Sequence, residues 1–402
     1  MQYDFTKIVD RHGKDSIAVD AKDIFGIFKV PTREGFERIP MWVADMNFET
    51  VPAIPRAMIQ RAEHPMYGYF APRQEYYDAI ADWQARANGV QALHPENISY
   101  QNGVLGGVIS ALRVLCEDGG EVLVNSPTYI GFTNALTNNG FKIVHSPLVL
   151  DAGGVWRMDL LDMERRIVSN KIHAAIMCSP HNPCGRVWER EELEQVMALY
   201  KKHNVFVISD EIWSDLTLPG ARHIPTQSVS DDARNRTIAL YAPSKTFNLA
   251  GLVGSYSIIY DDYLRDRFNK QSSLSDYNNM NLLSMYALIG AYSDEGRDWL
   301  QQLRQVLAGN VDFAVDYIEN HFDGVSVSRP QGTYMLWIDC EGWCRTHKKS
   351  LDDLLNAGVE YGVLWQDGRM FHGPYSIRLN LALPLSLVQE AFHRLDKWVF
   401  NG

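Results

Sequence analysis

The sequence has few cysteines, no long apolar run and no cluster of basic residues. Its five cysteines in 402 residues include no Cys-x-x-Cys pair, and no matching His or Cys cluster accompanies Cys340 and Cys344. This pattern argues against a zinc site, predicts no bound metal and indicates free thiols, as expected in a reducing cytoplasm. No stretch approaches the roughly 20 apolar residues of a membrane-spanning helix. Residues 1–11 carry charges where a secretory signal needs an apolar centre. We therefore expect neither a membrane-spanning helix nor a signal peptide.

The charge balance narrows the range of partners. The formal net charge is −11, and no run of five or six Lys or Arg occurs. We therefore expect no nucleic acid partner and no binding to anionic membranes. A hydrophobic fraction of 46% and a charged fraction of 22% are typical of a soluble globular protein.

Short apolar runs recur through the middle of the chain. Residues 121–125, 174–178, 205–209 and 237–241 fit strands buried on both faces, and helical patterns such as residues 190–200 separate them. This alternation predicts an α/β domain with a mostly parallel central sheet flanked by helices. In such sheets ligands bind beyond the carboxyl ends of the strands.

The C-terminal part has a different pattern. A long helical pattern begins at residue 299, and strand-like runs follow at 333–339 and 375–381. They predict a smaller α+β domain. We expect a large domain over residues 47–285 and a second unit made of residues 1–46 and 286–402, because the N-terminal segment is too short to fold alone.

Two polar side chains follow predicted strands at the expected ligand edge. Asn182 lies in a Pro- and Gly-rich turn, which is either a plain turn or the source of an amide donor. Asp210 ends the next strand, where an acidic residue is either a helix cap or a ligand of a bound group.

Two cations stand in unusual contexts. Lys245 follows a buried strand and precedes an apolar segment, so it is either a surface charge or a desolvated amine able to form an imine. Arg378 lies between apolar strand neighbours and needs an anion, either an internal carboxylate or a substrate carboxylate. A lysine amine together with a carboxylate that keeps a pyridine nitrogen protonated is what pyridoxal 5'-phosphate requires.

Together these segments resemble the fold type I pyridoxal-phosphate enzymes of the class I/II aminotransferase superfamily, nearest to its MalY/PatB-like cystathionine β-lyase branch. The resemblance spans nearly the whole chain. It rests on residues 40–48 (PMWVADMNF), 180–183 (PHNP), 209–212 (SDEI) and 244–252 (SKTFNLAGL).

The resemblance implies further roles for named residues. Lys245, Asp210 and Tyr129 would be catalytic, with Tyr129 stacked on the cofactor ring. The cofactor phosphate would be held by Ser244, by the turn at Val104 and Leu105, and by Tyr69 of a neighbouring subunit in a homodimer. Asn182 would bind the phenolic oxygen of the cofactor. The substrate carboxylate would lie between Arg378 and the segment that contains Trp42 and Ala44. Val253 stands where many relatives place an arginine on the phosphate.

The activity implied is cleavage of the carbon–sulfur bond in L-cystathionine or a related cysteine conjugate, with release of a thiol, pyruvate and ammonia. An aminotransferase would use the same residues, because both reactions begin by removing the α-proton. A pyridoxal-binding regulatory module is the third alternative, although no basic helix-turn-helix segment precedes the enzyme-like part.

Overall fold

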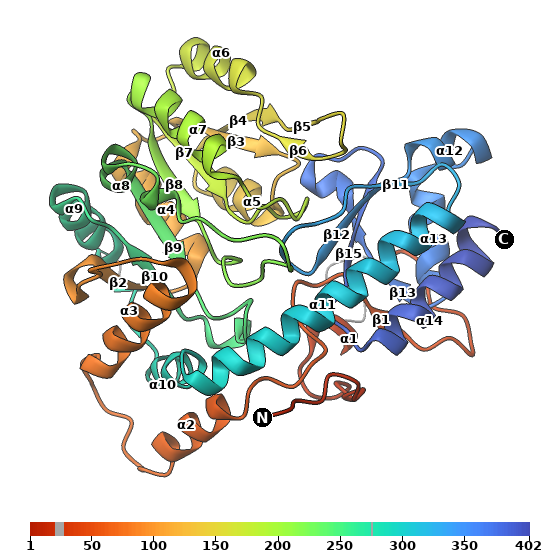
Figure 1. Cartoon of the computed structure of the whole chain (residues 1–402), viewed down its shortest axis with the longest axis horizontal. Coiled ribbons are helices and arrows are strands. Elements are labelled where there is room, and N and C mark those ends of the chain that lie inside the picture. Colours follow the sequence, from red (N-terminus) through yellow and green to blue (C-terminus); the bar gives the residue numbers. More distant parts are fainter. Residues whose placement is uncertain (21–27, 275) are drawn as a thin grey trace.

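The computed structural model describes residues 1–20, 28–274 and 276–402. Within those ranges the strands form two main sheets, one of seven strands and one of four. The long helix α11 (Asp294–His321) runs from the side of the large sheet to the side of the small one (Figure 1). No helix in these ranges is both long and apolar enough to cross a membrane.

The large sheet is mostly parallel, as the sequence predicts. Its strand order is β2-β10-β9-β8-β7-β3-β4, and only β10 runs antiparallel to its neighbours. The strands are β2 (Ile98–Gln101), β3 (Glu121–Ser126), β4 (Lys142–Pro147), β7 (Ala174–Cys178), β8 (Phe206–Asp210), β9 (Thr237–Tyr241) and β10 (Ser255–Ile258). The four apolar runs singled out in the sequence are therefore confirmed as β3, β7, β8 and β9.

Alternate residues of these strands point to opposite faces of the sheet, and helices pack against both faces. Val122 and Val124 of β3 pack with α4 (Val104–Leu115), α5 (Ile130–Asn138) and α9 (Asp262–Ser273). Leu123 between them packs with α6 (Leu160–Asn170) and α7 (Arg190–Lys202), and α8 (Asp231–Arg236) lies on the same face. Because both faces are buried, the strands read as continuous apolar runs rather than as alternating ones.

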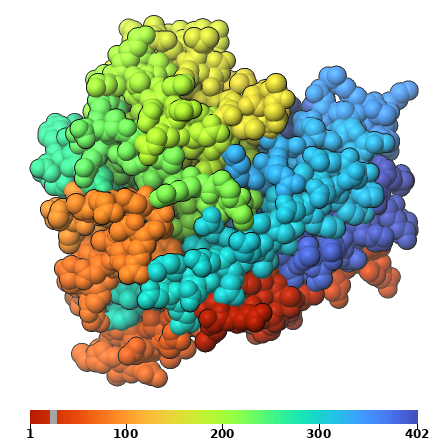
Figure 2. All heavy atoms as spheres, in the orientation of Figure 1, coloured from red at the N-terminus to blue at the C-terminus, as the bar shows by residue number. Residues whose placement is uncertain are grey.

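The smaller part is built on an antiparallel sheet of order β11-β12-β15-β14. Its strands are β11 (Ser326–Val327), β12 (Met335–Asp339), β14 (Gln366–Asp367) and β15 (Ser376–Asn380), accompanied by α12 (Glu341–His347), α13 (Leu351–Glu360) and α14 (Leu385–Leu395). The N-terminal segment contacts this part where β1 (Ile39–Pro40) pairs with β13 (Val363–Leu364). Figure 2 shows the red N-terminal residues beside the cyan and blue C-terminal ones.

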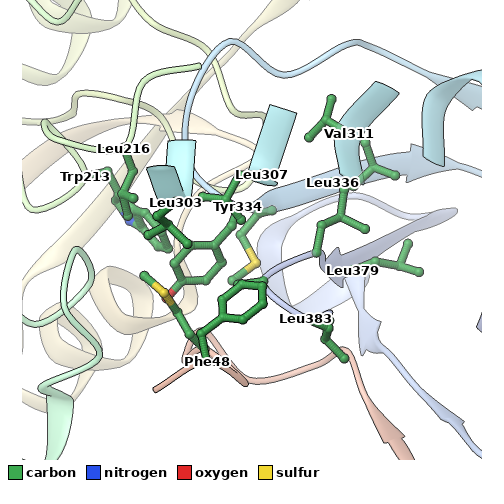
Figure 3. Close-up of a cluster of buried hydrophobic side chains, with 14 of the residues drawn as sticks. Phe48, Trp213, Leu216, Leu303, Leu307, Val311, Tyr334, Leu336, Leu379 and Leu383 are labelled. Atoms are coloured by element: carbon green, nitrogen blue, oxygen red, sulfur yellow. The ribbon is translucent and has the colours of Figure 1, made fainter. Parts of the chain in front are cut away.

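A shared core joins the two parts. Trp213 of the large part packs edge-on against Tyr334, with ring centroids 4.7 Å apart, next to Leu303 and Leu307 of α11 (Figure 3). The core also takes in helices α2 (Ala53–Ala62), α3 (Gln74–Asn88) and α10 (Leu282–Ala291). The division at residues 46/47 and 285/286 stays a prediction, because the apolar core is continuous across it.

Candidate active site

A cavity of about 270 Å³ lies at the carboxyl ends of β7, β8 and β9, where the sequence places the ligand. Its wall combines these strand ends with the first turn of α4 and one residue of the N-terminal segment. The predicted site residues that line it are Ala44, Val104, Leu105, Tyr129, Asn182, Asp210, Ser244 and Lys245.

Lys245 reaches the cavity from the turn after β9. Its Nζ donates a hydrogen bond to the carbonyl oxygen of Ala44 at 2.8 Å and lies 5.7 Å from the centre of the Trp213 ring. Burial lowers the pKa of the ammonium to about 8, and the positive charge of Arg378 adds to the effect. A substantial fraction of this amine is therefore neutral, and nucleophilic, near physiological pH.

Asp210 is the last residue of β8 and is buried. Its Oδ1 accepts a hydrogen bond from the backbone N–H of Ile212 at 3.1 Å. Burial raises the pKa of this carboxyl to about 7, although that hydrogen bond and Lys245 favour the charged form. A cationic N–H group placed beside Asp210 would restore its ionisation.

Arg378 projects from the middle of β15 and is 3% exposed. It donates hydrogen bonds to three neutral oxygens: Asn182 Oδ1 at 3.1 Å, the Trp42 carbonyl at 3.0 Å and Gln366 Oε1 at 3.4 Å. Its Nε has no hydrogen-bond partner among the described residues. Within the described ranges no carboxylate forms an ion pair with Arg378, so the internal salt bridge that the sequence left open is not found there. A buried cation without an anion favours an anionic ligand.

The first turn of α4 forms the opposite end of the cavity. Gly103 precedes the helix with φ of 83°, a conformation that favours glycine, and residues 102–106 line the wall. The free backbone N–H groups of such a helix start bind anions. Lys245 is the one basic side chain on the described wall, and Val253 is also part of it. An anion at this end would therefore be held by neutral donors such as these N–H groups and the hydroxyl of Ser244.

Three predicted site residues do not line the cavity, and of these Arg378 contacts its wall through Asn182. The indole of Trp42 points away from the cavity: its Nε1 donates to the Ala18 carbonyl at 3.1 Å, and the ring packs with Val359 and Leu364. Only the backbone carbonyl of Trp42 reaches the site, through Arg378. Tyr69 is fully exposed and lies outside the cavity of this single chain.

The structure adds residues that the sequence reasoning missed. Tyr334 donates a hydrogen bond to the Ala44 carbonyl at 3.0 Å, the same oxygen that Lys245 contacts. Asn380 Nδ2 donates to the carbonyls of Val43 and Asp45 and so holds this segment in place. The sequence could have indicated Asn380 as a site residue, because it lies two residues after Arg378 on the same face of an apolar strand. Nothing in the sequence distinguishes Tyr334 from an ordinary core tyrosine.

Comparison with known proteins places the chain in a family. A model of the aminotransferase class I and II family matches residues 39–395. Cystathionine beta-lyase PatB of Bacillus subtilis (strain 168) is 32% identical over 395 residues, which cover 97% of this chain and 98% of PatB. Protein MalY of Escherichia coli (strain K12) is 30% identical, with 96% of each chain covered. The chain therefore belongs to the aminotransferase class I and II family.

The fold comparison agrees. The PLP-bound C-S lyase from Staphylococcus hominis superposes with a TM-score of 0.90 at 27% identity, covering 100% of this chain and 99% of that one. A PLP-bound putative aminotransferase from Clostridium difficile 630 gives a TM-score of 0.89 at 31% identity, covering 98% and 99%. The fold type I assignment made from the sequence is confirmed.

Proposed function

We propose that this chain is a pyridoxal-phosphate-dependent carbon–sulfur β-lyase acting on L-cystathionine or a related cysteine conjugate. The observation that carries the proposal is that Lys245 and Asp210 line one cavity, while Arg378 is hydrogen-bonded to Asn182 of its wall and has no paired carboxylate in the described ranges. The names of PatB and of the Staphylococcus hominis enzyme support the lyase reaction.

The wall of the cavity fits the cofactor. Lys245 offers an amine with a lowered pKa for covalent attachment, and Asp210 offers a buried carboxylate for the pyridine N–H. The first turn of α4 and Ser244 offer N–H and O–H donors for the phosphate. Asn182 uses its Oδ1 for Arg378, which leaves its Nδ2 amide to donate to a phenolic oxygen. When bound, the cofactor supplies an electron-withdrawing ring that delocalises the charge left at the α-carbon of the substrate.

The chain's own residues then divide the work. Arg378 binds the substrate α-carboxylate with a bidentate pair of charge-assisted hydrogen bonds. Lys245, neutral in substantial fraction because its pKa is about 8, accepts the α-proton at Nζ. A thiolate leaves the β-carbon, and addition of water completes the conversion of the conjugate to thiol, pyruvate and ammonia. Tyr129 stays protonated at neutral pH, because burial raises the pKa of its hydroxyl.

We further propose a homodimer with active sites at the subunit interface. Met66, Tyr67 and Tyr69 form an exposed aromatic and apolar stretch, and Val253 and Tyr277 are exposed at the cavity itself. Apolar surface of this kind is typical of an interface. In a two-fold dimer Tyr69 would reach the phosphate end of the partner's cavity.

One assay tests the function directly. Purified holoenzyme is given L-cystathionine without any keto acid, and pyruvate and free thiol are followed over many turnovers. Sustained release of both in equal amounts supports the lyase, and Lys245→Ala serves as the inactive control. Turnover that requires an added keto acid, with the cofactor otherwise trapped in its amine form, would identify an aminotransferase instead.

A further inference from the structure

A second cavity, of about 400 Å³, is separate from the active site. The C-terminal end of α3, residues 214–223 and the first half of α11 form its wall, and Figure 1 shows α3 and α11 on the same side of the molecule. No described residue lines both cavities, yet Trp213 of the active site is followed directly by Ser214 of the second cavity. The proposed reaction uses none of this space.

Arginine dominates the charged part of this wall. The arginines that line it within the described ranges are Arg86, Arg222, Arg297 and Arg304. Two of them are already neutralised. Arg86 contacts Asp82 at 2.7 Å and Asp294 at 3.1 Å, and Arg297 contacts Asp294 at 3.0 Å. These four residues form a charge-balanced group.

The other two arginines have no such partner. Arg304 donates to the carbonyl of Thr217 at 2.5 Å and to its Oγ1 at 2.8 Å, both neutral acceptors. These bonds hold the guanidinium group in one orientation, and its Nη1 makes no hydrogen bond to the described chain. Arg222 lies with Nη2 close to Gly89 at the end of α3 and forms no ion pair with a described residue. The wall thus presents two arginines, the exposed Arg222 and the half-buried Arg304, that form no ion pair with a carboxylate of the described residues.

The remaining ionisable groups of the wall compensate this charge weakly. Asp215 is the one carboxylate of a described residue that lines it, and its oxygens accept hydrogen bonds from Trp83 Nε1 and Thr246 Oγ1, both at 2.9 Å. Burial raises the pKa of Asp215, and the positive charge of Arg304 acts in the opposite direction. His223 is 4% exposed; its Nε2 lies 2.7 Å from Glu211 Oε2, whereas its Nδ1 has no hydrogen-bond partner in the described chain.

We propose that this cavity binds a small dicarboxylate. Arg222 and Arg304 each accept one carboxylate group of the ligand as the counter-ion that the chain does not supply. Ala87, Ala221 and Leu300 offer apolar contacts for the carbon skeleton between the two carboxylates. A cavity of about 400 Å³ is in the range of small-molecule sites, which reach roughly 300–1,000 Å³.

Titration calorimetry of the holoenzyme with succinate tests the site. Because Arg378 also binds carboxylates, the titration uses holoenzyme carrying Arg378→Ala, at constant ionic strength set with chloride. One succinate per chain is expected to remain bound. Adding Arg222→Gln should weaken the dissociation constant at least about 10-fold through loss of a charge-assisted contact. Arg86→Gln is the matched control: its guanidinium lines the same cavity but is already paired, so it should change the constant less than about 3-fold.

Each outcome decides the proposal. Absence of binding in the Arg378→Ala holoenzyme, or equal binding with and without Arg222→Gln, would overturn it. Arg222 is exposed, so its replacement leaves the fold intact; Arg304→Gln checks the second contact. Inorganic phosphate in place of succinate tests the ligand class: binding as tight, with the same arginine dependence, would contradict a dicarboxylate site.

Discussion

Replacing Arg378 by alanine should separate substrate binding from cofactor binding. Arg378 is 3% exposed, and its hydrogen bonds go to Asn182, Trp42 and Gln366, all neutral. Its charge is therefore available to a ligand carboxylate. Hydrogen bonds to charged groups contribute about 1.5–3 kcal/mol each, and a bidentate pair does not add fully. A loss of about 2–4 kcal/mol in transition-state binding lowers kcat/KM roughly 30- to 900-fold.

The assay combines rate and spectrum. The kcat/KM for L-cystathionine is taken from thiol release, and the visible absorbance of the bound cofactor is recorded on the same sample. We expect the rate constant to fall as stated while the absorbance is retained. Arg378→Lys is the matched control, because it keeps the charge but loses the planar fork. Its kcat/KM should lie between those of the unaltered enzyme and of Arg378→Ala.

Two results would refute this reasoning. Loss of the cofactor absorbance in Arg378→Ala would make the arginine part of the cofactor site or of the fold. An unchanged kcat/KM would mean that the substrate carboxylate binds elsewhere. Urea denaturation of the variant distinguishes a folding defect, because Asn182 and the Trp42 carbonyl lose a donor at a cost of about 1–3 kcal/mol.

Two further predictions concern the other site residues. Borohydride reduction of the holoenzyme followed by peptide mapping should place the pyridoxyl group on Lys245, because no other lysine lines the described cavity. Recovery of the pyridoxyl group on another lysine, such as Lys270, would contradict this assignment. In the apoenzyme, Asp210 has a pKa raised to about 7, so between pH ~4 and ~7 the folded chain holds a proton that the unfolded chain releases. The free energy of unfolding should therefore fall as pH rises through this window, by at most roughly 4 kcal/mol. Asp210→Asn should flatten that dependence in urea titrations, and an unchanged slope would show that other groups cause it.

Local sequence patterns were sufficient for the large sheet and for two of the site residues. The apolar runs that became β7, β8 and β9 are buried on both faces, so their composition alone separates them from helices and loops. Asp210 and the turn of Lys245 follow such runs directly. Parallel strands bring their carboxyl ends to one edge, so the position of these residues in the sequence implied their proximity.

Other features of the site depended on the direction in which groups point and on packing between segments distant in the sequence. The sequence linked the segment at residues 40–48 to the substrate side, but not its orientation: the Trp42 carbonyl faces Arg378 while the indole faces Val359. Which side of a short irregular segment faces a cavity depends on the surfaces that pack against it. The sequence has no periodicity there from which to infer it.

The sequence by itself therefore determined the fold class, the ligand edge of the sheet and the lysine and aspartate at that edge, because these follow from patterns within one strand and its turn. The tertiary structure alone decided whether Arg378 has an internal carboxylate, since its contact with Asn182 spans 196 positions along the chain. It also brought Arg222 and Arg304 to one cavity from separate elements. Whether a charge is compensated depends on every charged and polar group that packing places near it. The set of these neighbours is defined only in the folded chain.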